Sequence, residues 1–159
     1  MTRISHIVSF ALSAVLFALV SCDLGQENED PKVQSQRLRT ESVQSINQRD
    51  YLRAEQLLSQ TVPLDQELQQ WDRLAEDRAT LARVQTSVGL FSSAIGNYVE
   101  AWKYYRQIGD NVTEIRLMSG IGNIYVGLGD FEKGIGFLRD AVDVSRLASN
   151  GETDPESNM

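Results

Sequence analysis

Apolar residues recur at helical spacing along most of this chain, and the pattern predicts helices rather than strands. From Val33 onward they return every three or four residues, as on one face of an α-helix. The clearest stretch runs from Met118 to Ala141, where two short amphipathic segments meet at Gly129-Asp130. This is the pattern of an antiparallel helical hairpin. The predicted fold class is therefore all-α.

A shifted copy of the same pattern precedes this stretch. A period of about 33 residues is typical of helical hairpins stacked into a solenoid. We therefore predict hairpins at 82–111 and 115–148, with turns at Gly96-Asn97 and Gly129-Asp130. The shift pairs Gly122 with Gly89, Gly129 with Gly96, Asp130 with Asn97, and Phe131 with Tyr98.

The remainder of the predicted helical domain, 33–148, is less regular. A degenerate hairpin is predicted at 33–61. Thr61-Val62-Pro63 is interpreted as a helix boundary, since Pro is tolerated near a helix start. An inserted helix is then predicted at 64–79. Two alternatives stay open: one helix from Leu64 to about Ile95, or two helices that meet near Ala79.

The two ends of the chain have other patterns. Residues 1–21 hold Arg3 and then an apolar run from Ile7 to Val20, which is too short to span a bilayer core of about 30 Å. The run ends in Leu19-Val20-Ser21-Cys22. Residues 149–159 have little to bury, and we expect a disordered tail.

This start resembles a bacterial lipoprotein signal peptide with its lipobox. The resemblance implies cleavage before Cys22, acylation of Cys22, and an acidic flexible tether at 22–32. It also implies a location in the bacterial cell envelope, lipid-anchored to a membrane and facing the periplasm or the exterior, with inner and outer membrane both open. The alternative is an uncleaved anchor or a buried N-terminal helix.

Composition removes several function classes. Cys22 is the only Cys and His6 the only His, and His6 lies in the segment that we expect to be cleaved. Zinc sites of Cys and His and Ser-His-Asp triads are therefore unavailable, and we predict no catalytic residue, cofactor or metal. The net charge of -7 lacks the basic footprint of nucleic-acid binding. A glycan-cleaving enzyme that uses Glu41 is the remaining catalytic alternative.

The best-formed hairpin resembles the tetratricopeptide repeat (TPR). The small, apolar and aromatic positions that carry the resemblance are Met118, Ile121, Gly122, Tyr125, Gly134, Leu138 and Ala141. The resemblance implies a short solenoid of stacked hairpins. We expect close backbone approach at Gly122 and Gly134, and at Gly89 and Ala101 in the preceding copy.

Ligands of this family usually lie along the face made by the first helix of each hairpin. The resemblance then implies a partner-binding groove of Arg83, Thr86, Leu90, Arg116, Ser119, Asn123 and Val126. Arg83 and Arg116, interpreted as one repeat apart, could grip a peptide carboxylate, with Asn123 bonding its backbone. The alternative is that both are solvated surface arginines. Trp71 and Trp102 are candidate exposed aromatics.

These observations predict a lipid-anchored adaptor that binds a segment of a partner protein and performs no catalysis. Two alternatives stay open. One is a structural subunit that completes its short array by forming a homodimer, and the other is the enzyme that uses Glu41.

Overall fold

The computed structural model describes residues 29–151. The predicted signal peptide, Cys22 and residues 22–28 of the predicted tether lie outside the described residues, as do residues 152–159. Residues 31 and 32 of the predicted tether are helical. The described part holds six helices and no strand, so the all-α prediction is confirmed. The helices are α2 (Pro31–Asn47), α3 (Tyr51–Glu67), α4 (Trp71–Ser87), α5 (Phe91–Gln107), α6 (Asn111–Gly127) and α7 (Phe131–Ser149).

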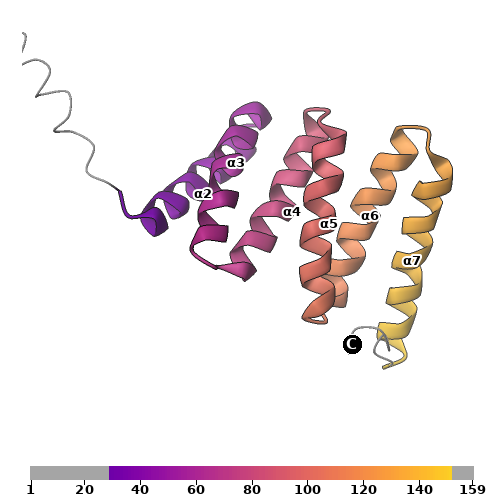
Figure 1. The fold of residues 1–159 in the computed structure, drawn as a ribbon. Coiled ribbons are helices and arrows are strands. Elements are labelled where there is room, and N and C mark those ends of the chain that lie inside the picture. The colour runs from indigo at the N-terminus through magenta and orange to yellow at the C-terminus, as the bar shows by residue number, and fades with distance from the viewer. Residues whose placement is uncertain (1–28, 152–159) are drawn as a thin grey trace, which may run out of the picture. The chain divides into compact units, whose positions relative to one another are not determined.

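Consecutive helices pack side by side as a row of antiparallel hairpins (Figure 1). The hairpins are α2–α3, α4–α5 and α6–α7, and each also packs on the next through α3 with α4 and α5 with α6. The first helices of the second and third hairpins, α4 and α6, also contact each other directly. The predicted stack of helical hairpins is therefore confirmed.

Helix starts are evenly spaced. Tyr51, Trp71 and Phe91, the first residues of α3, α4 and α5, lie 20 residues apart, and so do the starts of α6 and α7. One hairpin therefore occupies 40 residues rather than the 33 predicted from the sequence.

The turns repeat with the same spacing. Each places one residue in the left-handed region: Arg49 (φ 61°), Gln69 (φ 55°), Gly89 (φ 81°), Gly109 (φ 75°) and Gly129 (φ 82°). At three of the turns an Asp then caps the next helix, because its carboxylate accepts from a backbone N–H of the first turn. These caps are Asp50 to Arg53, Asp110 to Thr113, and Asp130 to Lys133.

The predicted turn at Gly96-Asn97 is wrong. Both residues lie inside α5, and the chain turns instead at Val88-Gly89-Leu90. Gly96 matches Gly129 only through the 33-residue shift. It is exposed and nothing lies within 4 Å of the place where its Cβ would be, so it is a tolerated helical glycine. The predicted hairpin 82–111 therefore begins and ends in the wrong places.

The boundary predicted at Pro63 and the inserted helix 64–79 are also wrong. Pro63 lies inside α3, which continues to Glu67, and α4 then begins at Trp71. Both alternatives for 64–95 fail, because Ala79 lies in the middle of α4. Pro63 is exposed, so the carbonyl that loses its helical N–H partner can face water.

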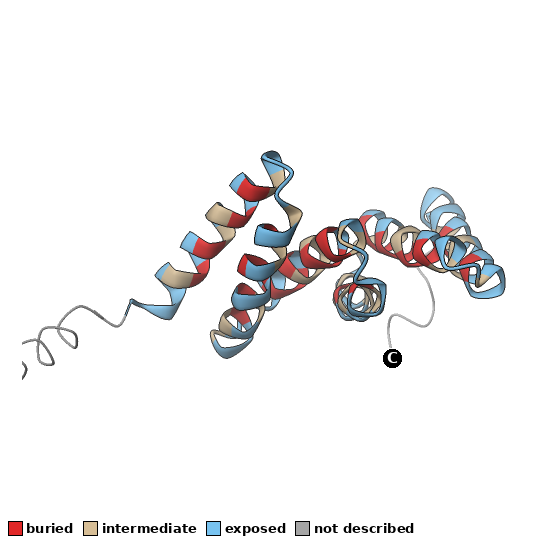
Figure 2. Cartoon of the chain, turned by 90° about the horizontal axis from the view of Figure 1, so that it is seen from above, coloured by how far each residue is buried: buried red, intermediate tan, exposed pale blue. Residues whose placement is uncertain are grey.

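Small buried residues let the two helices of each hairpin approach. The predicted contact of Gly122 and Gly134 is confirmed: a Cβ on Gly134 would lie 2.6 Å from Val126 Cγ2 and 3.0 Å from the Gly122 carbonyl oxygen. The pair Gly89 and Ala101 does not fill this role, because Gly89 forms a turn. Figure 2 shows the buried residues on the facing sides of the helices. The equivalent pairs, 40 residues apart, are Ser42 with Ala54 and Ala82 with Ala94.

One polar cluster interrupts the apolar core between α2, α3 and α4. Arg39 forms ion pairs with Asp65 at 2.7 Å and Asp77 at 2.9 Å, and both carboxylates are buried. The Ser35 hydroxyl donates a hydrogen bond of 2.5 Å to Asp65 Oδ1. One guanidinium therefore holds three helices together through two carboxylates.

None of the helices between residues 29 and 151 is both long enough and apolar enough to cross a membrane.

Candidate ligand cleft

A cleft of about 390 Å³ lies between the first helices of the second and third hairpins. Two tyrosines of α5 contribute to its lining together with both of these helices. The lining residues are Glu76, Ala79, Thr80 and Arg83 of α4, Tyr98 and Tyr105 of α5, and Arg116 and Leu117 of α6.

Helical spacing explains why these side chains meet. On α4, Glu76, Thr80 and Arg83 follow each other at intervals of four and three residues, which places them on one face. Tyr98 and Tyr105 are seven residues apart, so they project from the same side of α5. The side chains that line the cleft thus project from regular helices rather than from loops.

The two arginines carry the positive charge of the cleft. Both are exposed, and Arg116 Nη2 donates a hydrogen bond of 3.3 Å to Thr113 Oγ1. Glu76 adds one carboxylate to the lining. Among the lining side chains, two guanidinium groups thus face one carboxylate. Guanidinium groups bind carboxylates through paired hydrogen bonds, so the cleft suits an anionic group.

The tyrosine hydroxyls stay protonated at neutral pH. Burial raises the pKa of Tyr98, while Arg83, a hydrogen bond with Thr86 and Arg116 act in the opposite direction. Burial also raises the pKa of Tyr105, and the charges of Glu76 and Asp110 add to this shift while Arg116 opposes it. The Tyr105 hydroxyl can therefore donate a hydrogen bond to a bound segment, whereas the Tyr98 hydroxyl is engaged with Thr86.

Tyr98 is fixed by close packing against α6. A Cβ on Gly120 would lie 3.1 Å from Cζ of the Tyr98 ring. The glycine thus leaves the space that the ring occupies, which holds α5 and α6 close together at the cleft. A larger residue at position 120 would displace the ring.

The structure brings together two of the predicted groove residues, Arg83 and Arg116. They are not repeat equivalents, however: with a 40-residue repeat, Arg83 corresponds to Asn123, and Arg116 corresponds to Glu76. Their meeting results from the contact of α4 with α6, not from the repeated position assumed in the prediction.

The other predicted groove residues do not line this cleft. Leu90 precedes α5 in the turn and is 45% exposed. It was predicted to be a groove residue because the 33-residue shift assigned it to a helix. The Thr86 hydroxyl donates a hydrogen bond of 2.8 Å to the Ala82 carbonyl and lies behind Tyr98. Ser119, Asn123 and Val126 lie on α6 outside the lining.

Sequence reasoning did not include Tyr98 and Tyr105 among the groove residues. It also missed Glu76, which fell within the predicted insertion 64–79, and Thr80, which fell between that insertion and the predicted hairpin 82–111. The seven-residue spacing of the tyrosines was a visible signal, but only the correct helix boundaries place it beside Arg83 and Arg116.

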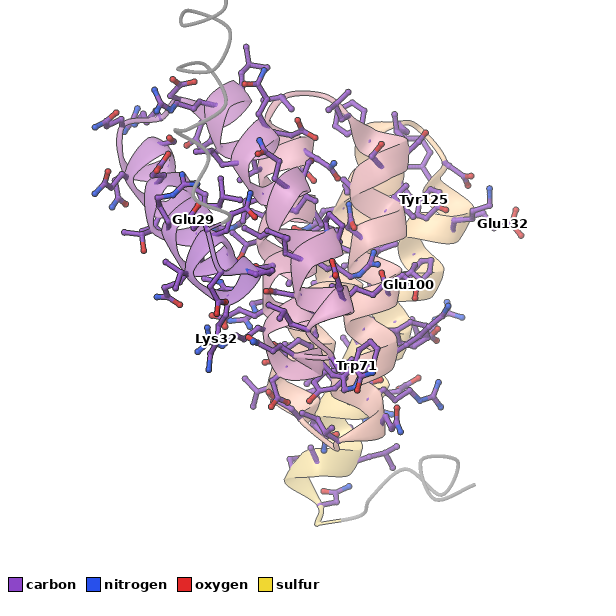
Figure 3. All side chains as sticks on the ribbon, turned by 60° about the vertical axis from the view of Figure 1, so that its left-hand side comes forward. Glu29, Lys32, Trp71, Glu100, Tyr125 and Glu132 are labelled. Atoms are coloured by element: carbon purple, nitrogen blue, oxygen red, sulfur yellow. The ribbon has the colours of Figure 1, made fainter. Side chains whose placement is uncertain are left out.

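The two tryptophans differ in environment. Trp71, labelled in Figure 3, is 52% exposed at the start of α4. It lies in a hollow of about 890 Å³ that Tyr104 and Ile108 also line. Trp102 is partly buried, and its indole N–H donates a hydrogen bond of 2.9 Å to Oε1 of the buried Glu114. Of the two candidate exposed aromatics, Trp71 alone presents a largely exposed ring.

Acidic side chains do not gather into a further site. Among residues 29–151, no group of three or more His, Cys, Asp or Glu side chains is arranged to hold a metal ion. Glu41, the carboxylate of the enzymatic alternative, forms an ion pair of 3.0 Å with Arg37, whose side chain is 48% exposed. Glu41 is therefore paired at the surface of α2.

Comparison with known proteins shows which folds this structure resembles. No family model matches the sequence, and no curated protein matches it. The structure is similar to the crystal structure of the TPR domain of Arabidopsis FLU, with a TM-score of 0.66 and 16% identity over 76% of this chain and 99% of that domain. The chain has a TPR-like fold. The TPR-like chain is also similar to the crystal structure of MamA, with a TM-score of 0.60 and 16% identity over 81% of this chain and 74% of MamA.

The TPR-like hairpins differ from the usual repeat in length. The family repeat has about 34 residues, whereas the hairpins here recur every 40 because most helices have 17 residues. The packing positions survive this change. Those of the third hairpin, Gly122, Gly134, Leu138 and Ala141, correspond to Ala82, Ala94, Tyr98 and Ala101, and to Ser42, Ala54, Leu58 and Thr61.

Proposed function

We propose that this protein is a binding scaffold of the bacterial cell envelope, which holds an extended segment of a partner protein in the cleft between α4 and α6. One observation carries the proposal: Arg83 and Arg116, from two different hairpins, line one cleft with Tyr98 and Tyr105. The partner segment bears a carboxylate, either at its C-terminus or on an acidic side chain. The protein acts by binding and performs no chemistry.

The charge of the cleft supports a carboxylate as the anchoring group. An anion that enters an acidic chain has few favourable positions, and the two arginines provide one of them. The Tyr105 hydroxyl supplies a donor for a second oxygen or for a backbone carbonyl. Arg83 and Arg116 are both exposed, so a bound carboxylate can reach them without entering the helical core.

The test is recovery of a partner from membranes with wild type and with the Arg83→Glu/Arg116→Glu variant. We expect recovery to fall at least about tenfold, because the reversed charges repel a carboxylate. A matched control is Arg53→Glu/Lys103→Glu, which reverses two exposed charges of α3 and α5 outside the cleft lining. Equal loss in both variants, or no loss in the first, would contradict the proposal.

The chemistry of the segment can be tested separately. Synthetic peptides from the recovered partner are compared with a free and an amidated C-terminus. A loss of affinity on amidation identifies the terminal carboxylate as the anchoring group. If amidation has no effect, acidic side chains are replaced one at a time. A partner whose binding needs no carboxylate would contradict the proposal.

The membrane anchor is a further part of the proposal and rests on the lipobox-like sequence alone. We propose that Cys22 is acylated and that the helical unit faces the periplasm or the exterior. Two or three acyl chains, each contributing about 0.8 kcal/mol per buried methylene, hold a protein durably at a bilayer. Labelling with a clickable fatty acid should mark the wild type and should fail with Cys22→Ser. Equal labelling of both would contradict acylation at this residue.

A further inference from the structure

The last helix has an apolar stripe of which three residues stay exposed among the described helices. Phe131, Ile135 and Val142 of α7 are 61%, 53% and 57% exposed. With the partly buried Leu138 they follow each other at spacings of four, three and four residues, which is the seam pattern of two packed helices. The adjacent side of α7 packs on α6 through Gly134 and Ala141, and Leu138, at the edge of the stripe, also contacts α6 at Gly122.

The earlier hairpins indicate what kind of element covers these positions. In α3, the equivalents Tyr51, Leu58 and Val62 pack in one cluster with Leu81 and Val84 of α4. In α5, the equivalents Ile95 and Tyr98 pack in a cluster that includes Ile124 of α6. In both cases, the cover is the first helix of the next hairpin. The stripe of α7 is therefore shaped to receive another helix.

The outer side of α2 is a poor cover. Positions equivalent to Leu81 and Val84 are Glu41 and Gln44, and the preceding turns of that side carry Arg37 and Gln34. Stacking α2 of a second copy onto α7 would bury Glu41 and Arg37 against Ile135, which costs free energy through desolvation. Open head-to-tail stacking is thus disfavoured. The segment 152–159 has only Pro155 and Met159 as apolar residues, so its sequence offers no apolar stripe that matches that of α7.

We propose that α7 pairs antiparallel with α7 of a second copy, so that the chain forms a two-fold dimer. The stripe is self-complementary in this arrangement, because Phe131 meets Val142 of the second copy and Ile135 meets Leu138. Glu132 and Arg139 flank the seam on the same side of α7 and are both exposed. In this register Glu132 lies beside Arg139 of the second copy, and symmetry repeats the pair. Glu132 projects away from its own helices in Figure 3.

Sedimentation equilibrium tests the dimer with the chain from Asp23 onward, which contains the compact unit of all six helices. We expect a concentration-dependent dimer for the wild type. Ile135→Glu should raise the dissociation constant at least about tenfold, because it places two charges in the seam. Leu52→Glu is the control: Leu52 of α3 is 67% exposed and lies outside the seam. Circular dichroism should show unchanged helicity in both variants.

Charge reversal tests the register. Glu132→Arg and Arg139→Glu should each weaken the dimer roughly three- to tenfold, since two ion pairs become two like-charge contacts. The double variant should restore the dimer, as the pairs then form with the charges exchanged. A monomer at all concentrations would overturn the proposal. So would a dimer that resists Ile135→Glu, or one in which the double variant shows no rescue.

This dimer does not depend on the proposed function of the cleft. Arg83 and Arg116 lie outside the stripe, so Ile135→Glu should leave partner recovery by each chain unchanged. Failure of one proposal therefore leaves the other standing.

Discussion

Gly134 shows at the scale of one residue how tightly α6 and α7 pack. A methyl group at this position would meet Val126 and the backbone of Gly122 at 2.6 to 3.0 Å. Backbone cannot move aside as the end of a side chain can. We predict that Gly134→Ala lowers the free energy of unfolding by about 1–3 kcal/mol, although alanine favours helices. Urea denaturation measures the change.

Gly136 is the matched control, two residues further along the same helix. Nothing lies within 4 Å of the place where its Cβ would be. We predict that Gly136→Ala raises the free energy of unfolding by about 0.5–1 kcal/mol, through helix propensity alone. If both variants shift stability in the same direction, the close approach of α6 and α7 is not the reason that position 134 holds glycine.

Two turns use a residue that is poorly suited to its backbone conformation. Arg49 and Gln69 have positive φ at the positions that Gly89, Gly109 and Gly129 fill in the later turns. A left-handed conformation costs a residue with a Cβ about 1 kcal/mol. We predict that Gln69→Gly stabilises the protein by up to about 1 kcal/mol and that Gly89→Ala destabilises it similarly. Thermal unfolding compares the two, and stabilisation by Gly89→Ala would contradict this reading of the turns.

At the scale of elements, the sequence predicts the existence of helices better than their ends. The hairpin around Gly129 was found because its turn combines glycine, an aspartate cap and flanking apolar runs. The true turn at Gly89 is followed by Leu90, which has no capping side chain, while Gly96-Asn97 imitates a turn inside a helix. Local residue chemistry therefore pointed to the wrong site, and only packing between helices decides the register.

Pro63 illustrates the same limit. Within α3 it removes one backbone donor, and the sequence alone predicts a break there. The helix continues because Thr61 and Asp65, on either side of Pro63, are both fully buried. Tertiary contacts with α2 and α4 outweigh the local cost, and such contacts are not visible in the spacing of apolar residues.

The Arg39 cluster makes stability depend on pH. Burial raises the pKa of Asp77 above its ordinary 3.8, with Arg39 opposing the shift and the neighbouring Asp65 adding to it; a hydrogen bond with Thr61 also opposes it. The folded chain thus holds this proton more tightly than the unfolded chain. The contribution of Asp77 to stability is therefore fully present below pH 3.8 and is lost as the pH rises through the raised pKa.

We therefore predict that the wild type gains stability relative to the Asp77→Asn variant as the pH falls from 7 toward 4. The quantity compared is the difference between their free energies of unfolding. Urea denaturation at several pH values measures this difference, in which carboxylates that do not interact with Asp77 cancel. A difference that does not change with pH would contradict the shift assigned to Asp77.

Arg39 itself should be essential to the first hairpin. Removing it by Arg39→Met leaves Asp65 and Asp77 buried without their cation, and we predict a loss of about 3–5 kcal/mol. The exposed Arg37, whose ion pair with Glu41 lies at the surface, is the control, and Arg37→Met should change stability by less than about 1 kcal/mol. Similar losses in the two variants would contradict a buried structural role for Arg39.

At the scale of the whole molecule, the candidate site depends on how hairpins stack. Arg83 and Arg116 were predicted to act together, but for the wrong reason, since they do not occupy equivalent positions. They meet because α4 contacts α6, with Tyr98 and Tyr105 behind them. The arginines were found through the resemblance to the family's groove positions, whereas the tyrosines and Glu76 needed the correct stacking register.

The most direct measurement is photo-crosslinking to the partner in intact cells. A photoreactive amino acid is placed at Thr80 inside the cleft, and in a second variant at Ser93, an exposed residue of α5 in the groove next to α3 and α4. A binding cleft between α4 and α6 predicts a covalent partner from Thr80 and none from Ser93. A partner trapped from Ser93 and not from Thr80 would contradict the claim that this cleft holds the partner.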